Sequence, residues 1–295
     1  MYETILVPTD GSAHAERAGR HAVSLAEAFD ATVTMLGVAD VEGAAGPFDA
    51  GGVSAEFRER VEAESESTVE DAAALADDRV AVETAVVEGD PAEAIVDYAD
   101  EGEFDAVAMG THGRRGLSRL VFGSVARYVV RHTTRPVLTA RETDVDPVTD
   151  YEDVLVPTDG SDAAEAAVDH GIAVADAFGA TLHAFHVVDL SAMTTGSGIE
   201  PPTQQLERYT EAGEAAVEAV AERARAAGLD TETTVEHGFP SADLLDYVDE
   251  AGVDLVAMGT HGRTGIDRVL LGSTTERILT RSPVPVVAVH PDDAA

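Results

Sequence analysis

Two six-residue strings each occur twice in this 295-residue chain, and both pairs show the same spacing. VPTDGS stands at Val7–Ser12 and again at Val156–Ser161, and MGTHGR stands at Met109–Arg114 and again at Met258–Arg263. In each pair the second copy begins 149 positions after the first. A constant spacing over two separate motifs predicts that one domain has been duplicated in tandem. Since 44% of the residues are hydrophobic, each half has enough apolar side chains for a core of its own.

A polar stretch that contains proline, Arg141–Tyr151, separates the two copies. Such a composition is typical of a linker rather than of a strand or a helix. We therefore predict domain 1 over residues 1–141, a linker over residues 142–151 and domain 2 over residues 152–295.

Each copy alternates short apolar segments, which predict strands, with longer segments of helical periodicity. In the first copy we expect strands at Thr4–Val7, Thr32–Val38, Val80–Val87, Ala106–Met109 and Pro136–Thr139. We expect helices at Ser12–Phe29, Ala55–Asp77 and Ser124–Arg131, a further helix that starts at Asp90-Pro91, and a loop at Gly43–Gly52. This alternation predicts an α/β fold class, with two tandem doubly wound (Rossmann-like) domains. Each would hold a parallel sheet with helices on both faces.

Each copy also carries the pattern G-x2-G-x9-G-S directly after its fourth expected strand. The pattern runs from Gly110 to Ser124 in the first copy and from Gly259 to Ser273 in the second. Glycines after a strand let backbone N–H groups approach a phosphate, and the closing Gly-Ser begins a helix whose free N–H groups favour an anion. TDGS follows the first strand of each copy, so both motifs are expected at the carboxyl edge of the sheet, where ligands bind in such folds.

The chain is acidic overall and basic at these motifs. It has 19 basic residues, all arginine, against 56 acidic ones, for a formal charge of −37. Residues Gly110–Arg141 nevertheless carry seven arginines and no acidic residue, and Gly259–His290 carries four arginines against two acidic residues. We expect a few of these arginines to serve the anion site and the others to pair with acidic helices or to cover an interdomain face. The acidic, lysine-free background is typical of proteins from a halophile's salt-rich cytoplasm, where salt screens self-repulsion.

The composition excludes several function classes. A strongly negative chain lacks the basic face that general binding to nucleic acid or to anionic membranes requires. Without cysteine it has no disulfides, thiolate nucleophiles or cysteine-based zinc sites, and without lysine it has no Schiff-base chemistry and no GxxxxGK[ST] loop. No apolar run approaches the ~18 residues of a membrane span, and a strand expected from Tyr2 leaves no room for a signal peptide. We therefore expect a soluble, cytoplasmic protein.

Together these residues resemble the universal stress protein family, whose ATP-binding members carry G-x2-G-x9-G-[ST], and the resemblance covers nearly the whole chain. It implies a five-stranded parallel sheet of order 3-2-1-4-5 in each domain, and one adenine nucleotide per domain. It implies an adenine and ribose pocket lined by Pro8, Asp10 and Val38 in domain 1 and by Pro157, Asp159 and Val187 in domain 2. The ribose and phosphates would be held by Met109, Gly110, Gly113, Arg114, Gly123, Ser124 and Val125, and by Met258, Gly259, Gly262, Arg263, Gly272, Ser273 and Thr274.

Several of these residues have more than one interpretation. Asp10 and Asp159 could act as acid–base catalysts, bind a metal through the phosphates, anchor the nucleotide or only form the Asp-Gly-Ser turn, and the resemblance favours the anchor. His112 and His261 could be catalytic, but shaping the loop or donating to a phosphate is the better interpretation. We predict no catalytic residue and no dedicated metal site, with Mg²⁺ or Mn²⁺ bound only through the phosphates.

The sequence favours a nucleotide-dependent sensor or switch that binds ATP in both domains. It shows no positioned base, lysine clamp or acidic metal pair of the kind that fast phosphoryl transfer uses. The alternatives are a slow ATP-hydrolysing enzyme and a stress scaffold that binds AMP or another adenylate. The resemblance also implies an intramolecular pseudo-dimer through the last strands, Pro136–Thr139 and Pro285–Val289, while a further homodimer and a protein partner stay open.

Overall fold

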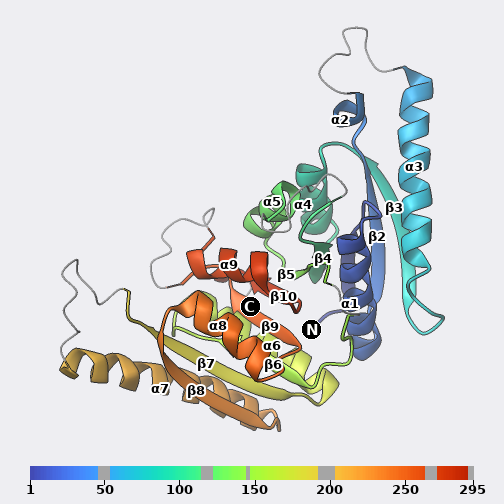
Figure 1. Cartoon of the computed structure of the whole chain (residues 1–295). Helices are drawn as coiled ribbons and strands as arrows, with labels where there is room; N and C mark the ends of the chain where they lie inside the picture. Colours follow the sequence, from blue (N-terminus) through green and yellow to red (C-terminus); the bar gives the residue numbers. More distant parts are fainter. Residues whose placement is uncertain (46–53, 114–121, 144–146, 192–202, 263–270, 292–295) are drawn as a thin grey trace. The chain divides into compact units, whose positions relative to one another are not determined.

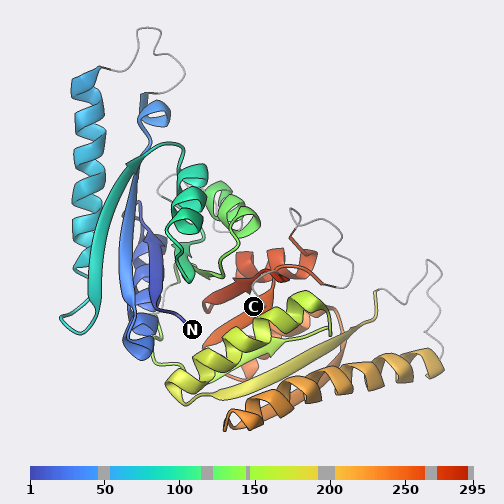
Figure 2. The same ribbon diagram turned by 180° about the vertical axis from the view of Figure 1, so that it is seen from behind.

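A computed structural model describes residues 1–45, 54–113, 122–143, 147–191, 203–262 and 271–291 of the chain (Figures 1 and 2). The chain separates into two compact units, Met1–Thr149 and Asp150–Ala295, which we call domain 1 and domain 2. The division between them falls within the stretch 142–151 that the sequence predicts as a linker.

Domain 1 alternates strands and helices along the chain. Its strands are β1 (Thr4–Pro8), β2 (Thr32–Ala39), β3 (Ala81–Glu88), β4 (Ala106–Gly110) and β5 (Val137–Ala140). Its described helices are α1 (Ala13–Phe29), α2 (Val41–Ala45), α3 (Ala55–Ala73), α4 (Pro91–Glu101) and α5 (Ser124–His132). The strands pair in parallel in the order β3-β2-β1-β4-β5, which confirms the expected order 3-2-1-4-5.

Domain 2 repeats this architecture. Its strands are β6 (Asp153–Pro157), β7 (Thr181–Asp189), β8 (Thr231–Gly238), β9 (Leu255–Gly259) and β10 (Val286–Val289). Its described helices are α6 (Asp162–Phe178), α7 (Thr203–Ala226), α8 (Pro240–Glu250) and α9 (Ser273–Arg281). The parallel order is β8-β7-β6-β9-β10, so the two copies in the sequence correspond to two copies of one fold.

Local sequence rules account for where the main helices begin. The hydroxyls of Ser12 and Ser161 accept hydrogen bonds from the backbone N–H groups of Ala15 and Ala164, each at 3.3 Å, and thereby cap α1 and α6. Asp90 caps α4 in the same way through the N–H of Ala92 at 2.9 Å. These caps fix the point at which the chain turns away from the carboxyl end of each preceding strand.

Helices cover both faces of each sheet. In domain 1, α3 runs along β2 and β3, while α4 and α5 lie on the other side of the sheet (Figures 1 and 2). In domain 2, β7 shows the same division at two histidines. His183 lies 6.0 Å, ring to ring, from Tyr247 of α8, and His186 packs against Gly213 of α7. The two histidines therefore face opposite sides of the sheet, as their spacing on a strand predicts.

The core behind β7 differs from the core behind β2 at one matched position. His186 is buried, donates from Nδ1 to the carbonyl of Thr158 at 2.7 Å, and lies so close to Gly213 that a Cβ there would meet its ring at 2.4 Å. The equivalent residue of domain 1 is Gly37, where a Cβ would lie 3.0 Å from Val69 of α3. In domain 2 the strand supplies the large side chain, His186, and the helix supplies the glycine. In domain 1 the strand supplies the glycine, Gly37, and the helix supplies the larger side chain, Val69.

Two expectations from the sequence were wrong in detail. The short helix α2, which starts at Val41, extends into the stretch Gly43–Gly52 that was expected as a loop, because Asp40 accepts the N–H of Gly43 at 2.7 Å and starts a turn. The rest of that loop lies outside the described residues. Helix α3 ends at Ala73 rather than at Asp77, because Asp77 instead accepts the N–H of Arg79 in a turn that leads into β3.

Within the described parts of the chain, no helix is both long and apolar enough to span a bilayer.

Two equivalent histidines, His21 in α1 and His170 in α6, are buried in the helix faces that pack on the sheets. Burial lowers the pKa of His21 to about 3 and that of His170 to about 4, with Arg17 adding to the effect on His21. An unfolded histidine titrates near pH ~6.5, so the unfolded chain takes up protons first as the pH falls. The stability that these neutral rings contribute is therefore present above pH ~6.5 and is lost as the pH falls toward their folded pKa values.

We expect His21→Leu to reduce the acid sensitivity of domain 1. Each of the two histidines should cost about 2 kcal/mol of unfolding free energy between pH ~7.5 and pH ~5, and the variant should remove its share. Urea unfolding of the full chain at both pH values, in constant salt, measures this difference. His132→Ala, at an exposed position, is the control and should leave the difference unchanged. An equal acid sensitivity of His21→Leu and the unaltered chain would show that His21 is not the titrating group.

Candidate functional site

The TDGS loops form the same turn in both domains. Asp10 Oδ1 accepts the N–H of Ser12 at 3.0 Å, and Thr9 Oγ1 accepts the N–H of Gly11 at 3.2 Å. In domain 2 the corresponding distances, for Asp159 and Thr158, are 3.0 and 3.1 Å. Gly11 and Gly160 both have a φ of +71°, a conformation that favours glycine. The aspartates therefore do form the turn, with one carboxylate oxygen.

The other carboxylate oxygen lies against the glycine motif. A Cβ on Gly113 would come within 2.5 Å of Asp10 Oδ2, and a Cβ on Gly262 within 2.8 Å of Asp159 Oδ2. The loops after the first and fourth strands of each domain are thus in contact at the carboxyl edge of the sheet. Only a residue without a side chain leaves the carboxylate in this position.

The first glycine of each motif allows strand and helix to approach closely. A Cβ on Gly110 would lie 2.7 Å from the backbone of His14 at the start of α1, and a Cβ on Gly259 would lie 2.3 Å from the carbonyl oxygen of Ala163 in α6. These contacts are with backbone, which cannot move aside as a flexible side chain would. The glycine loop is consequently held directly beside the first helix of its domain.

The last glycine of each motif closes the loop and begins a helix. The N–H of Gly123 donates to the carbonyl of Thr111 and that of Gly272 to the carbonyl of Thr260, both at 2.9 Å. Both glycines are N-caps with no side-chain hydrogen bond, and Ser124 and Ser273, the first helical residues, are exposed. Among the described residues no side chain caps α5 or α9, which leaves the N–H groups of their first turns suited to an anion.

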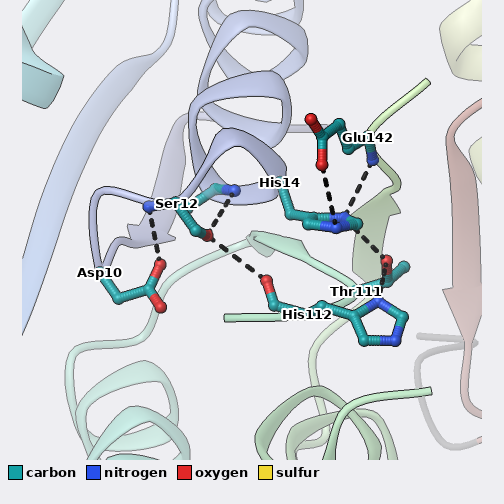
Figure 3. Close-up of polar contacts among 7 residues, drawn as sticks. Asp10, Ser12, His14, Thr111, His112 and Glu142 are labelled. Atoms are coloured by element: carbon teal, nitrogen blue, oxygen red, sulfur yellow. Dashed lines mark hydrogen bonds and ion pairs between the residues drawn. The ribbon is translucent and has the colours of Figure 1, made fainter. Parts of the chain in front are cut away.

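Behind the glycine loop of domain 1 lies a set of polar contacts (Figure 3). Ser12 Oγ donates to the carbonyl of His112 at 3.4 Å, while the hydroxyl of Thr111 lies 3.1 Å from Nδ1 of His112 and 3.3 Å from Nδ1 of His14. His14 Nδ1 in turn accepts the N–H of Glu142 at 2.9 Å. In Figure 3 the His112 ring lies beside His14 and Thr111 rather than beside Asp10, an arrangement suited to shaping the loop.

The other predicted residues lie at or next to the same edge. Pro8 and Pro157 end β1 and β6, and Val38 and Val187 are half-buried near the ends of β2 and β7. Met109 and Met258 are buried in the strands that precede the glycine loops, whereas Val125 and Thr274 are half-buried in the first turns of α5 and α9. Arg114 and Arg263 lie outside the described residues.

Of the other basic residues after the glycine loop, Arg135 lies 3.9 Å from Asp100 of α4, an ion pair of the structural kind expected from the sequence. Arg141 lies close enough to His112 for its charge to affect that ring. Burial, followed by the charge of Arg141, lowers the pKa of His112. In the described segments no three His, Asp or Glu side chains are placed to hold a metal ion.

The sequence did not indicate His14 or Glu142 as site residues. They are 128 positions apart and lie in no motif, and Ala163 takes the place of His14 in domain 2. Only the contact itself, between the start of α1 and the chain just after β5, shows that they belong to this edge.

Comparison with known proteins agrees with the architecture. A universal stress protein of Mycolicibacterium smegmatis is 28% identical over 302 aligned residues, which cover 97% of each chain. The universal stress protein MJ0531 of Methanocaldococcus jannaschii is 34% identical over 140 residues, or 47% of this chain and 82% of its own. The crystal structure of a universal stress protein from Archaeoglobus fulgidus superposes with a TM-score of 0.71, at 22% identity, over 97% of this chain and 96% of its own, and so shows the same fold.

The family assignment rests on the whole chain rather than on one motif. The sequence pattern of the universal stress protein family matches twice, at residues 1–141 and at residues 150–290. Each match contains one TDGS turn and one glycine loop in the arrangement described above. The chain therefore belongs to the universal stress protein family and carries two copies of its domain in tandem.

Proposed function

We propose that this protein is a nucleotide-dependent regulator that binds one adenine nucleotide, ATP, at the carboxyl edge of each domain. One observation carries the proposal: in both domains the TDGS turn and the glycine loop meet beside a helix N-terminus that no side chain of the described segments caps. Backbone N–H groups, a helix dipole and a surface without Cβ atoms are the features that bind phosphate.

The proposed roles follow the order of the motifs. Close to the adenine and ribose we place Pro8, Asp10 and Val38, and in domain 2 Pro157, Asp159 and Val187. For the ribose and phosphates we propose Met109, Gly110, Gly113, Arg114, Gly123, Ser124 and Val125, with Met258, Gly259, Gly262, Arg263, Gly272, Ser273 and Thr274 in domain 2. The carboxylates anchor the nucleotide, and Mg²⁺ or Mn²⁺ would come with its phosphates rather than with a protein cage.

The geometry favours binding over catalysis. Each aspartate is held by its own turn and by the neighbouring glycine. The imidazole of His112 contacts Thr111 and lies beside His14, on the side of the loop away from Asp10 (Figure 3). No general base therefore faces the proposed phosphate position among the described residues. A slow ATPase is the alternative, and a scaffold for AMP or another adenylate is a second one. Pairing of the domains through their last strands, a cytoplasmic location and a halophilic origin stay predictions.

Nucleotide content is the direct test of this proposal. We expect acid-denatured, purified full-length protein to release adenine nucleotide, close to one per domain when the protein has first been incubated with Mg·ATP. Anion-exchange chromatography of the supernatant identifies the species. Retained ATP supports binding, whereas ADP formed with measurable turnover supports the ATPase. Protein that holds no adenylate and shows no heat of ATP binding would contradict both.

A double variant, Ser124→Asp with Ser273→Asp, should separate nucleotide binding from folding. An acidic side chain in the first turn of a helix interacts favourably with the helix dipole. The unfolding temperature should therefore stay within about 2 °C of that of the unaltered protein or rise. The same charge repels phosphate, so the affinity for ATP should fall at least ~tenfold in calorimetric titration. The serines are preferable to glycine as targets, because a Cβ on Gly123 would lie 2.6 Å from the carbonyl oxygen of Thr111.

Ser124→Ala with Ser273→Ala is the matched control for this variant. It removes the two hydroxyl donors and adds no charge, so it should lose only a few-fold in affinity. An aspartate variant that binds ATP as tightly as the alanine control would show that the phosphates do not lie at these helix ends.

A further inference from the structure

In each domain, the threonine of the glycine loop contacts two imidazoles. Thr111 Oγ1 lies 3.1 Å from Nδ1 of His112 and 3.3 Å from Nδ1 of His14. Thr260 Oγ1 lies 2.9 Å from Nδ1 of His261 and 3.3 Å from Nδ1 of His290. All three groups of the first set are largely buried: Thr111 is 2% exposed, His112 is 8% exposed and the side chain of His14 is 14% exposed.

The second imidazole comes from a different place in each domain. His14 stands in the first turn of α1, where domain 2 has Ala163, and His290 follows β10, where domain 1 has Arg141. The pair is therefore not a simple copy of one duplicated position. Two unrelated positions supply the same contact to the same hydroxyl, which points to a requirement of the loop.

In domain 1 the hydrogen bonds specify the protonation state of His14. Its Nδ1 accepts the N–H of Glu142, so this nitrogen carries no proton and the neutral ring carries its proton on Nε2. Nδ1 has a single lone pair, and the N–H of Glu142 at 2.9 Å is the nearer donor to it. The Thr111 hydroxyl, at 3.3 Å, shares that lone pair as a longer and weaker donor while it accepts from Nδ1–H of His112 at 3.1 Å. Protonation of Nδ1 would remove this lone pair and place an N–H against the N–H of Glu142, so the bond from Glu142 would break and Nδ1 would no longer accept from the Thr111 hydroxyl.

The surroundings of His14, taken together, also favour the neutral ring, although the neighbouring charges act in both directions. They come from three elements: Asp10 from the turn after β1, His112 from the glycine loop, and Arg141 with Glu142 from the chain after β5. Burial is the largest effect and lowers the pKa of His14, followed by His112, and Arg141 lowers it further. Glu142, whose carboxylate lies 3.7 Å from Nε2, and Asp10 oppose these effects. The net direction is downward, so the ring is neutral near pH 7 and takes up a proton in acid.

We propose that His14 is a positioning residue for the phosphate loop of domain 1, that it holds this loop only as the neutral ring, and that acid therefore weakens adenine-nucleotide binding at this site. This inference rests on the proposed function. The neutral ring links the first turn of α1, the threonine of the glycine loop and the chain just after β5. Once the ring is protonated, the loop loses the support from His14 and keeps the one from Ser12.

A protonated ring also adds a positive charge near the phosphates, which acts in the opposite direction. At about 1 M salt the Debye length is only ~3 Å, so the part of this attraction that passes through solvent is weakened, whereas the lost hydrogen bonds are not. Measured in strong salt, the affinity should consequently fall with pH.

The variants His14→Asn and His14→Ala separate these effects. The Asn Oδ1 takes the place of the imidazole Nδ1, so it can accept the N–H of Glu142 but cannot be protonated. Ala keeps neither property. Each variant is made together with Ser273→Asp, so that titration with Mg·ATP in about 1 M KCl measures the site of domain 1. Ser273→Asp without a change at His14 is the reference, and affinities are measured from pH ~7.5 to pH ~5.

At pH ~7.5 we expect the Ala variant to bind ATP about tenfold more weakly than the reference, and the Asn variant to stay within about twofold of it. The affinity of the reference should fall toward that of the Ala variant as the pH decreases. The terminal phosphate of ATP titrates near pH ~6 in all three samples, so the Asn variant shows that contribution alone. Equal pH profiles for the reference and the Asn variant, or unchanged affinity of the Ala variant, would overturn the proposal.

A second measurement does not depend on nucleotide. Hydrogen-exchange protection of the Glu142 amide, corrected for intrinsic exchange, should fall in acid in the reference, stay constant in the Asn variant and be low throughout in the Ala variant. A reference protein that binds no ATP at any pH contradicts the proposed function, while Glu142 protection still tests the proton-dependent contact. Protection that does not change with pH would overturn that contact as well.

Discussion

The pairing of β1 with β4, and of β6 with β9, is the constraint on which the site of each domain depends. In domain 1, β2 and β3 lie on one side of β1 in the sheet, and β4 pairs with β1 on its other side. Ile5 lies opposite Ala106, and Leu6 lies opposite Val107. The loops after β1 and β4 therefore leave neighbouring strands in the same direction and must meet. Glycine at the end of β4 then allows the first helix to approach backbone to backbone. The strand order alone thus places the two motifs side by side, without any contact made by their side chains.

Features governed by near neighbours in the sequence could be predicted, and features that depend on distant contacts could not. Ser12 and Asp90 cap helices through N–H groups two or three residues away, so their roles follow from local rules. The alternation of strands and helices indicated a doubly wound fold, whereas the strand order came from family resemblance. The contact between His14 and Glu142 spans 128 residues and has no local signature. Helix α3 ends early because of a turn at Asp77, which helical periodicity alone does not mark.

The two domains are alike at the loops and different behind them. Turn distances at Asp10 and Asp159 agree within 0.1 Å, and both glycine loops close with the same 2.9 Å hydrogen bond. Behind the loops, one domain supports its threonine with a histidine from α1 and the other with a histidine that follows β10. The geometry of the turns and of the loop closures is thus the same in both domains, while the side chain that supports the threonine differs.

The equivalent strand positions Gly37 and His186 differ in side-chain size, and this difference has a consequence for how a tandem repeat folds. Two adjacent copies of one fold in a nascent chain can trade equivalent segments, so that a strand of one copy docks on a helix of the other. The ring of His186 fits against α7 only because Gly213 has no side chain. In domain 1, Val69 of α3 packs against Gly37 of β2, which has no side chain either. A mispaired α3 would collide with the imidazole, and a mispaired α7 would leave a hole beside Gly37. Both errors carry a packing penalty, so each helix is matched to the strand of its own copy.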